Sequence, residues 1–166
     1  MAAPRIREAC DLVDEALQYE SSWRRAEEHR AMFGEGTAYY GASVGAIRAT
    51  LRDTLRRFPD LTHDEITALS SLLWEVDVYE RRLAAVILLQ SHLDVLVVTD
   101  LTRLEGFLRS SGVDELGLAL ARDVIRPLLH SLADRDRSRA DTVIARWTES
   151  EDLLLRRAAQ TAAHDS

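Results

Sequence analysis

The sequence contains no lysine, one cysteine, three prolines and seven glycines in 166 residues. All 21 of its basic residues are therefore arginines, and each can form a bidentate fork to a carboxylate or a phosphate. Because Cys10 is alone, a disulfide framework and a cysteine zinc cluster are excluded. No apolar run reaches the length of a membrane span, and the amino terminus lacks the apolar segment of a signal peptide. We therefore expect a soluble, cytoplasmic protein with no membrane partner.

The scarcity of proline and glycine, together with abundant alanine, leucine, arginine and glutamate, favours helix throughout the chain. Hydrophobic residues make up 46% of the sequence and charged residues 30%, an ordinary balance for a folded domain. The net charge of −7 argues against non-specific coating of nucleic acid, but it leaves room for a local basic groove.

Apolar residues recur at helical spacing along most of the chain, and local capping signals mark where helices begin. Ser21 or Ser22 is the expected N-cap of a second helix, and Thr62 with Glu65 forms a capping box. The run 93–98 is strand-like, but it has no partner strand, so we expect a helix end and a connection. About nine helices are expected, over residues 7–20, 21–33, 44–58, 62–76, 78–91, 99–110, 114–132, 136–147 and 150–162.

Two segments of the chain resemble one another, which indicates a repeat. "DVYERRLAAV" (77–86) and "DLLLRRAAQT" (152–161) both read Asp, three residues, Arg-Arg, one residue, Ala, and a tryptophan precedes each. Their separation is about two helical hairpins of HEAT length. The pattern predicts an all-α fold of antiparallel helix pairs, an α-solenoid of the HEAT-like or armadillo-like kind. We expect one domain over residues 1–166, with residues 1–33 as a candidate N-terminal helical cap.

Two motifs that suggest chemistry are better explained by helix structure. "GASVG" (41–45) matches the serine-hydrolase elbow, but that turn requires a preceding strand, and Ser43 is the expected N-cap of a helix instead. The histidines are scattered without the spacing of paired ligands, so no metal site is expected.

Arginines are candidates for nucleic-acid contacts at two places. Arg48, Arg52 and Arg56 recur every four residues, so they share one helix face and can follow a phosphate backbone. A solvated face paired with Asp53 explains the same pattern equally well. Arg157 is either an ion-pair partner within the fold or a phosphate-binding fork, with small residues beside it that leave room for a ligand.

Asp114 follows "SGV" and opens a long expected helix, in which Pro127 should produce a kink or mark the final turns. The sequence favours Asp114 as the N-cap of that helix. The alternative is a carboxylate presented to a ligand. A carboxylate that caps a helix is less free to act on a ligand, so the two roles compete.

An ordered set of segments resembles the DNA alkylation repair glycosylases that are built from HEAT-like repeats. The resemblance runs from about residue 35 to the end of the chain. The segments that carry it are "YYGASVGAIR" (39–48), "SSLLWEVDVYERRLAAVILL" (70–89), "SSGVDELGLALARDVI" (110–125) and "IARWTESEDLLLRRAAQ" (144–160).

The resemblance implies a protein that binds double-stranded DNA on a concave helical surface and excises N3- or N7-alkylated purines. Asp114 matches the family's catalytic aspartate, and Arg157 matches the arginine that contacts the DNA backbone. Neither a metal nor a nucleotide cofactor is implied.

Two departures from the family pattern support a second interpretation. Ser110 and Ser111 stand where the family has aromatic residues that line the lesion site, and the family's further C-terminal repeats are not present after Arg157. A homodimer or another partner would then cover the C-terminal end. The alternative function is a catalytically weak or inactive HEAT-repeat module that binds DNA or protein.

Overall fold

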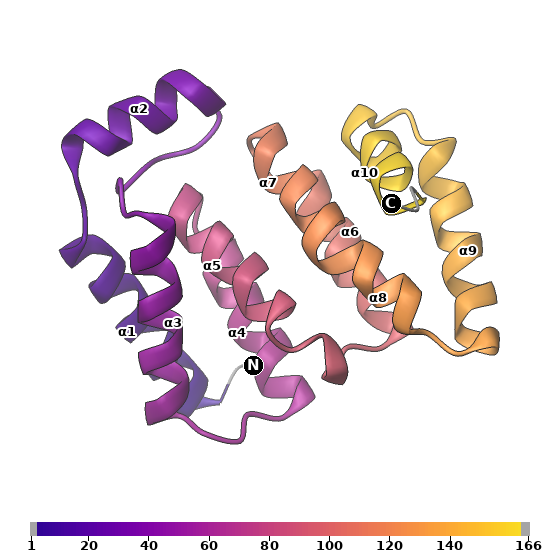
Figure 1. The fold of residues 1–166 in the computed structure, drawn as a ribbon, viewed down its shortest axis with the longest axis horizontal. Helices are drawn as coiled ribbons and strands as arrows, with labels where there is room; N and C mark the ends of the chain where they lie inside the picture. Colours follow the sequence, from indigo (N-terminus) through magenta and orange to yellow (C-terminus); the bar gives the residue numbers. More distant parts are fainter. Residues whose placement is uncertain (1–2, 164–166) are drawn as a thin grey trace. The chain divides into compact units, whose positions relative to one another are not determined.

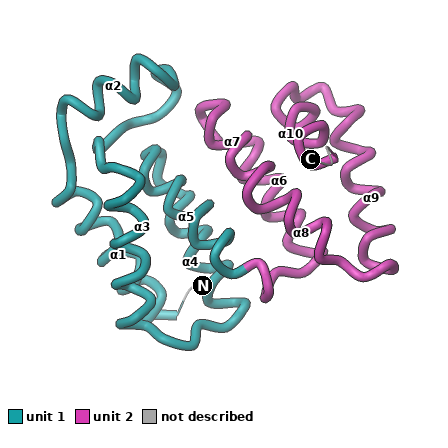
Figure 2. Tube along the Cα trace, in the orientation of Figure 1, with its two compact units in different colours: residues 1–92 teal, residues 93–166 magenta. Residues whose placement is uncertain are grey.

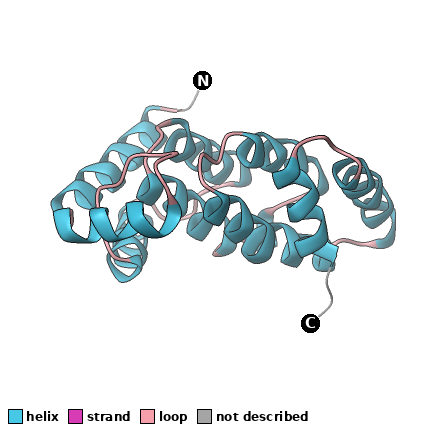
Figure 3. Cartoon of the chain, turned by 90° about the horizontal axis from the view of Figure 1, so that it is seen from above, coloured by secondary structure: helices cyan, strands magenta, loops and turns pink. Residues whose placement is uncertain are grey.

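The computed structural model describes residues 3–163 and divides into two compact units, residues 1–92 and 93–166 (Figure 2). In the described part of the chain, helices are joined by loops and no strand is present beyond one isolated bridge between Ala38 and Val78 (Figure 3). The predicted all-α fold class is therefore confirmed. Among the residues searched, no helix combines the length and apolarity needed to cross a membrane.

The first unit contains five helices, labelled in Figure 1. They are α1 (Pro4–Tyr19), α2 (Trp23–Phe33), α3 (Val44–Arg57), α4 (His63–Glu75) and α5 (Tyr79–Gln90).

Local capping explains where three of these helices begin. The side chains of Ser22 and Ser43 accept hydrogen bonds from the backbone N–H groups of Arg25 and Ala46. Thr62 and Glu65 form the complete reciprocal capping box. These three N-terminal predictions are confirmed, because the signal for each lies within four residues of the helix start.

Helices α4 and α5 form a hairpin in which arginines satisfy the free carbonyl groups at the end of α4. The Nη2 and Nε atoms of Arg81 donate to the carbonyls of Leu72 and Leu73 at 2.9 and 3.4 Å. The Nε of Arg82 donates to the carbonyl of Trp74 at 3.0 Å, and its guanidinium lies over the Trp74 ring. The last carbonyls of a helix have no partners within it, so these bonds fix α5 against the end of α4.

A buried carboxylate on α5 holds the loop between α2 and α3. Glu80 is fully buried and accepts hydrogen bonds from the backbone N–H groups of Tyr40 and Gly41 at 2.9 and 2.8 Å. Gly41 has φ of 82°, and a Cβ there would lie 2.1 Å from the carbonyl oxygen of Ser22. Only glycine fits this crossing of the loop with the start of α2.

The second unit begins with two short 3₁₀ turns, Leu93–Val95 and Val98–Asp100, so the prediction of a connection over 93–98 is confirmed. It continues with α6 (Leu101–Arg109), α7 (Asp114–Leu120), a π segment (Ala121–Ile125), α8 (Arg126–Ser131), α9 (Asp134–Thr148) and α10 (Leu153–Ala163). Residues 3–163 therefore contain nine helices when α7, the π segment and α8 are counted as one, as expected.

The helix over residues 114–131 is continuous through the π segment that precedes Pro127. The backbone N–H of Arg126 donates to the carbonyl of Ala121, five residues earlier. Proline has no N–H to donate and its ring crowds the carbonyl four residues before it, here Asp123. The wider π turn accommodates both effects, so the predicted disturbance at Pro127 takes the form of a π segment rather than a break.

Candidate functional site

Asp114 and Arg157 meet on the surface of the second unit. Nη1 of Arg157 donates to Oδ2 of Asp114 at 2.8 Å. The Arg157 side chain is 42% exposed and the Asp114 side chain is 70% exposed. The structure thus brings together the two residues that the sequence singled out from segments more than forty positions apart.

The expected N-cap role of Asp114 is wrong. The helix takes Val113 as its N-cap, and Asp114 is its first residue. The carboxylate of Asp114 instead points to Arg157 on α10. An anion in the first turn of a helix is stabilised by the helix dipole without a capping hydrogen bond.

A glycine allows α10 to approach α7 closely beside this pair. A Cβ on Gly117 would lie 2.8 Å from Cδ2 of Leu154, so the Leu154 side chain fills the space that Gly117 leaves. Gly117 is three residues after Asp114, and Leu154 is three residues before Arg157. The two contacts are one helical turn apart and show that α7 and α10 run antiparallel here.

Aromatic side chains in the second unit are buried. Phe107 is 7% exposed and Trp147 is fully buried, and these are the only Phe, Tyr or Trp residues among positions 93–163. Where the family pattern has aromatic residues, the Ser111 side chain is buried and the Ser110 hydroxyl donates to the carbonyl of Gly106. The described surface of this unit therefore exposes no Phe, Tyr or Trp ring, and its exposed ring is the imidazole of His130.

Glu105 organises a polar cluster that the sequence reasoning missed. Its Oε2 accepts from Nε1 of Trp147 at 2.8 Å and from Nη2 of Arg146 at 2.7 Å, and its Oε1 accepts from Arg109 at 2.9 Å. Burial by itself would raise the pKa of Glu105, but these donors outweigh it and hold the pKa below its ordinary value. The cluster satisfies the indole N–H of a buried tryptophan, and only its i,i+4 spacing from Glu105 to Arg109 was visible in the sequence.

Arg156, which is next to Arg157 in the sequence, has a different environment from Arg157. Nη1 of Arg156 donates to the carbonyl of Ser150 at 3.2 Å, just after the end of α9. Arg156 thus supports the turn between α9 and α10, while Arg157 faces Asp114.

Arg48, Arg52 and Arg56 lie in the first unit and share an exposed face of α3. With Leu51, Leu55, Ile87 and Ser91 they line a pocket of about 470 Å³ beside α5. Arg56 is 3.5 Å from Asp53, as the solvated alternative expects for one member of the stripe. The common face is confirmed, whereas contact with phosphate stays a prediction.

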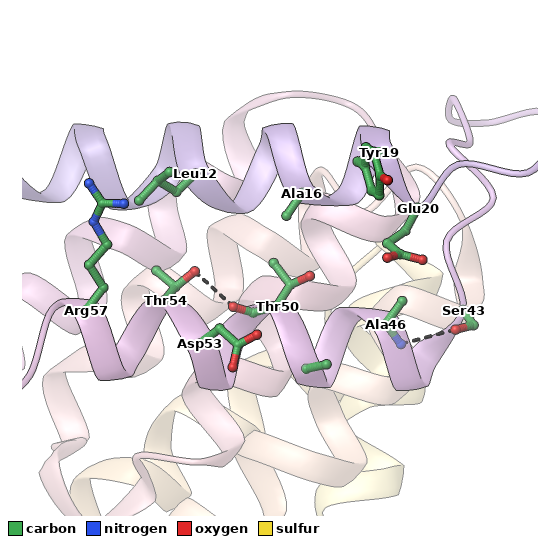
Figure 4. Close-up of a pocket in the computed structure, with 11 residues that line it drawn as sticks. Leu12, Ala16, Tyr19, Glu20, Ser43, Ala46, Thr50, Asp53, Thr54 and Arg57 are labelled. Atoms are coloured by element: carbon green, nitrogen blue, oxygen red, sulfur yellow. Dashed lines mark hydrogen bonds between the residues drawn. The ribbon is translucent and has the colours of Figure 1, made fainter.

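A groove of about 740 Å³ lies between α1 and α3 in the first unit (Figure 4). Leu12 and Ala16 of α1 face Thr50 and Thr54 of α3 across it, and Arg57 lies toward one end. Its residues do not include Asp114, Arg157 or the three arginines of the stripe.

Residues 3–163 hold no group of three or more His, Cys, Asp or Glu side chains arranged to bind a metal ion. Ser43 of the "GASVG" motif caps α3, and a loop rather than a strand precedes it. The described chain is therefore an all-helical protein with an accessible carboxylate beside an arginine and a separate arginine stripe.

Comparison with known families agrees with this class. Residues 13–164 match the family described as DNA alkylation repair enzyme. The match covers more than half of the chain, and the protein belongs to this family. Membership indicates a role in DNA alkylation repair and suggests DNA as a partner. A comparison with curated proteins finds no match.

Proposed function

We propose that this protein is a DNA glycosylase that excises N3- or N7-alkylated purines from duplex DNA. The observation that carries the proposal is the meeting of Asp114 and Arg157 at 2.8 Å on an exposed face. Within a family of DNA alkylation repair enzymes, a carboxylate beside an arginine that can bind phosphate is suited to stabilising positive charge on a sugar of the DNA backbone.

The chemistry requires little more than a well-placed anion. Alkylation at N3 or N7 leaves the purine cationic, so the base departs as a neutral molecule with the electron pair of the C1′–N bond. The sugar then carries positive charge shared between C1′ and its ring oxygen, and a nearby carboxylate stabilises that charge. Water adds at C1′ and releases a proton, which the carboxylate or solvent accepts.

Asp114 is suited to this role because it is exposed and ionisable at the start of a long helix. Loss of a cationic base needs no strong general acid, so a single carboxylate is sufficient. Arg157 would hold the backbone phosphate next to the lesion through its planar fork.

Asp114→Asn should remove base release while leaving DNA binding in place. The variant keeps the shape of the side chain but removes the charge that stabilises the sugar cation, and we expect a loss of about 100-fold or more. The measurement is release of free base from duplexes that contain 7-methylguanine or 3-methyladenine.

Asp123→Asn is the matched control for this experiment. Asp123 lies on the same continuous helix and accepts a hydrogen bond from Arg122 at 2.9 Å. We expect it to retain base release. Equal loss in both variants, or base release that persists in Asp114→Asn, would contradict the proposed role of Asp114.

The arginine stripe of α3 is the proposed second contact with the DNA backbone. Replacing Arg48, Arg52 and Arg56 by alanine should weaken binding to any duplex sequence and reduce the slope of log K against log salt by about one per lost phosphate contact. Arg24→Ala is the control, since Arg24 is an exposed arginine of α2 that pairs with Glu28. An unchanged slope in the triple variant would show that the stripe is a solvated face.

A non-catalytic DNA-binding module is the second candidate function. It is favoured by the burial of Phe107 and Trp147, which leaves no exposed Phe, Tyr or Trp ring in the described part of the second unit to hold an extruded base. Duplex binding without release of either methylated base would support this candidate and reject the glycosylase.

A further inference from the structure

We propose that the Asp114–Arg157 ion pair is a latch that a phosphodiester of the DNA backbone opens. The inference rests on the proposed function, because it concerns the same carboxylate and the same arginine. It adds that the two groups restrain one another in the free protein and act separately on DNA.

Each partner is occupied by the other in the structure. The 2.8 Å bond between Nη1 of Arg157 and Oδ2 of Asp114 is the side-chain hydrogen bond that joins α10 to α7 at this point. An arginine beside the carboxylate opposes the growth of positive charge at a nearby sugar, because it neutralises the field of Asp114. The closed pair therefore suppresses the property for which the carboxylate is needed.

The pair is weak enough to be opened by a competing anion. The Arg157 side chain is 42% exposed and the Asp114 side chain is 70% exposed, so water screens the attraction between them. Exposed ion pairs of this kind contribute little to the free energy of folding. A phosphodiester presents two anionic oxygens that match the planar fork of Arg157. When Arg157 turns to phosphate, its charge is balanced there and Asp114 regains its full negative field.

This arrangement makes DNA binding and the ion pair mutually exclusive. Opening the pair costs part of the binding free energy, so removing Asp114 should improve the affinity for DNA only while Arg157 is present. A double-mutant cycle isolates this coupling from the separate effect of each residue.

The test measures binding of an undamaged fluorescent duplex to the wild-type protein, Asp114→Ala, Arg157→Ala and the double variant. We expect Asp114→Ala to bind about two- to fivefold more tightly, the range that an exposed pair allows. Arg157→Ala should bind more weakly, and Asp114→Ala should give no gain in the Arg157→Ala background. Thermal unfolding of each variant checks that all four are folded.

Glu115→Ala is the matched control, since it removes a neighbouring carboxylate on the same helix turn. If Asp114→Ala gains equally in both backgrounds, or if Glu115→Ala gains as much, the effect is general repulsion and the latch is rejected. If Asp114→Ala gains nothing where Arg157→Ala loses affinity, the latch is rejected while the phosphate contact stands. The glycosylase proposal is judged separately, by base release.

Discussion

At the scale of single residues, Asp14 links three neighbours in the first unit. Its Oδ1 accepts from the Tyr40 hydroxyl at 2.8 Å and from Arg81 at 2.9 Å, and its Oδ2 accepts from Gln18 at 2.7 Å. Burial opposes ionisation of Asp14, but the donors prevail and lower its pKa. Burial and, after it, the hydrogen bond to Asp14 together raise the pKa of Tyr40 to about 12.

These opposite pKa shifts predict a loss of stability at both ends of the pH range. The folded pKa of Asp14 is lowered, so its contribution is present above pH 3.8 and is lost as pH falls through the folded value. The folded pKa of Tyr40 is raised, so its contribution is present below pH 10 and is lost between pH 10 and about 12. Urea unfolding across pH should show Tyr40→Phe with a shallower alkaline decline than wild type. An identical alkaline decline would mean that Tyr40 does not couple to folding.

The two arginine doublets show how far residue patterns can predict structure. Arg81 and Arg82 are both buried and bind the end of α4. Arg156 and Arg157 are accessible to solvent and bind different partners, Ser150 and Asp114. The repeated letters predicted antiparallel helix pairs, and both arginine doublets lie on helices, near their starts. Their partners come from other helices, which the sequence pattern does not contain.

At the scale of helices, the approach of α7 to α10 depends on Gly117. Gly106 of α6 provides a comparison, because a Cβ there meets nothing within 4 Å. Replacing a helical glycine by alanine in open space stabilises a protein by about 0.5–1 kcal/mol. We expect this gain for Gly106→Ala, and a smaller gain or a loss for Gly117→Ala because of Leu154.

The cause can be checked in the background of Leu154→Ala. Shortening Leu154 removes the atoms that a Cβ on Gly117 would meet, so Gly117→Ala should then stabilise about as much as Gly106→Ala. The measurement is the free energy of urea unfolding for the single and double variants. If Gly117→Ala stabilises fully with Leu154 intact, the close approach does not limit this site.

Helix identity was predictable because it is local. Spacing of apolar residues located the helices, and Ser22, Ser43 and Thr62 located three starts. The buried clusters around Glu80 and Glu105 were not predictable, since their donors lie about forty residues away in the chain. The capping prediction for Asp114 failed for the same reason, because its partner is on α10.

At the scale of the whole molecule, the chain folds as two compact units that divide between His92 and Leu93. A single HEAT-like domain over residues 1–166 and a cap over residues 1–33 stay predictions. Helix α2, within that cap, buries only Ala26 and exposes most of Trp23 and Met32. Asp114 and Arg157 belong to the second unit and Arg48, Arg52 and Arg56 to the first, so each set can be altered without touching the core of the other unit.

The π segment before Pro127 also keeps the long helix in phase with the core of the second unit. Leu116, Leu120, Val124 and Leu128 recur every fourth residue and are all fully buried. In an unbroken α-helix, three such steps would rotate the row by about 120° and carry its last member away from the core. One extra residue in the π turn reverses about 100° of that rotation. A sequence period of four and a single buried face are thus reconciled within one helix, and Asp114 is the first residue of the helix that carries this row.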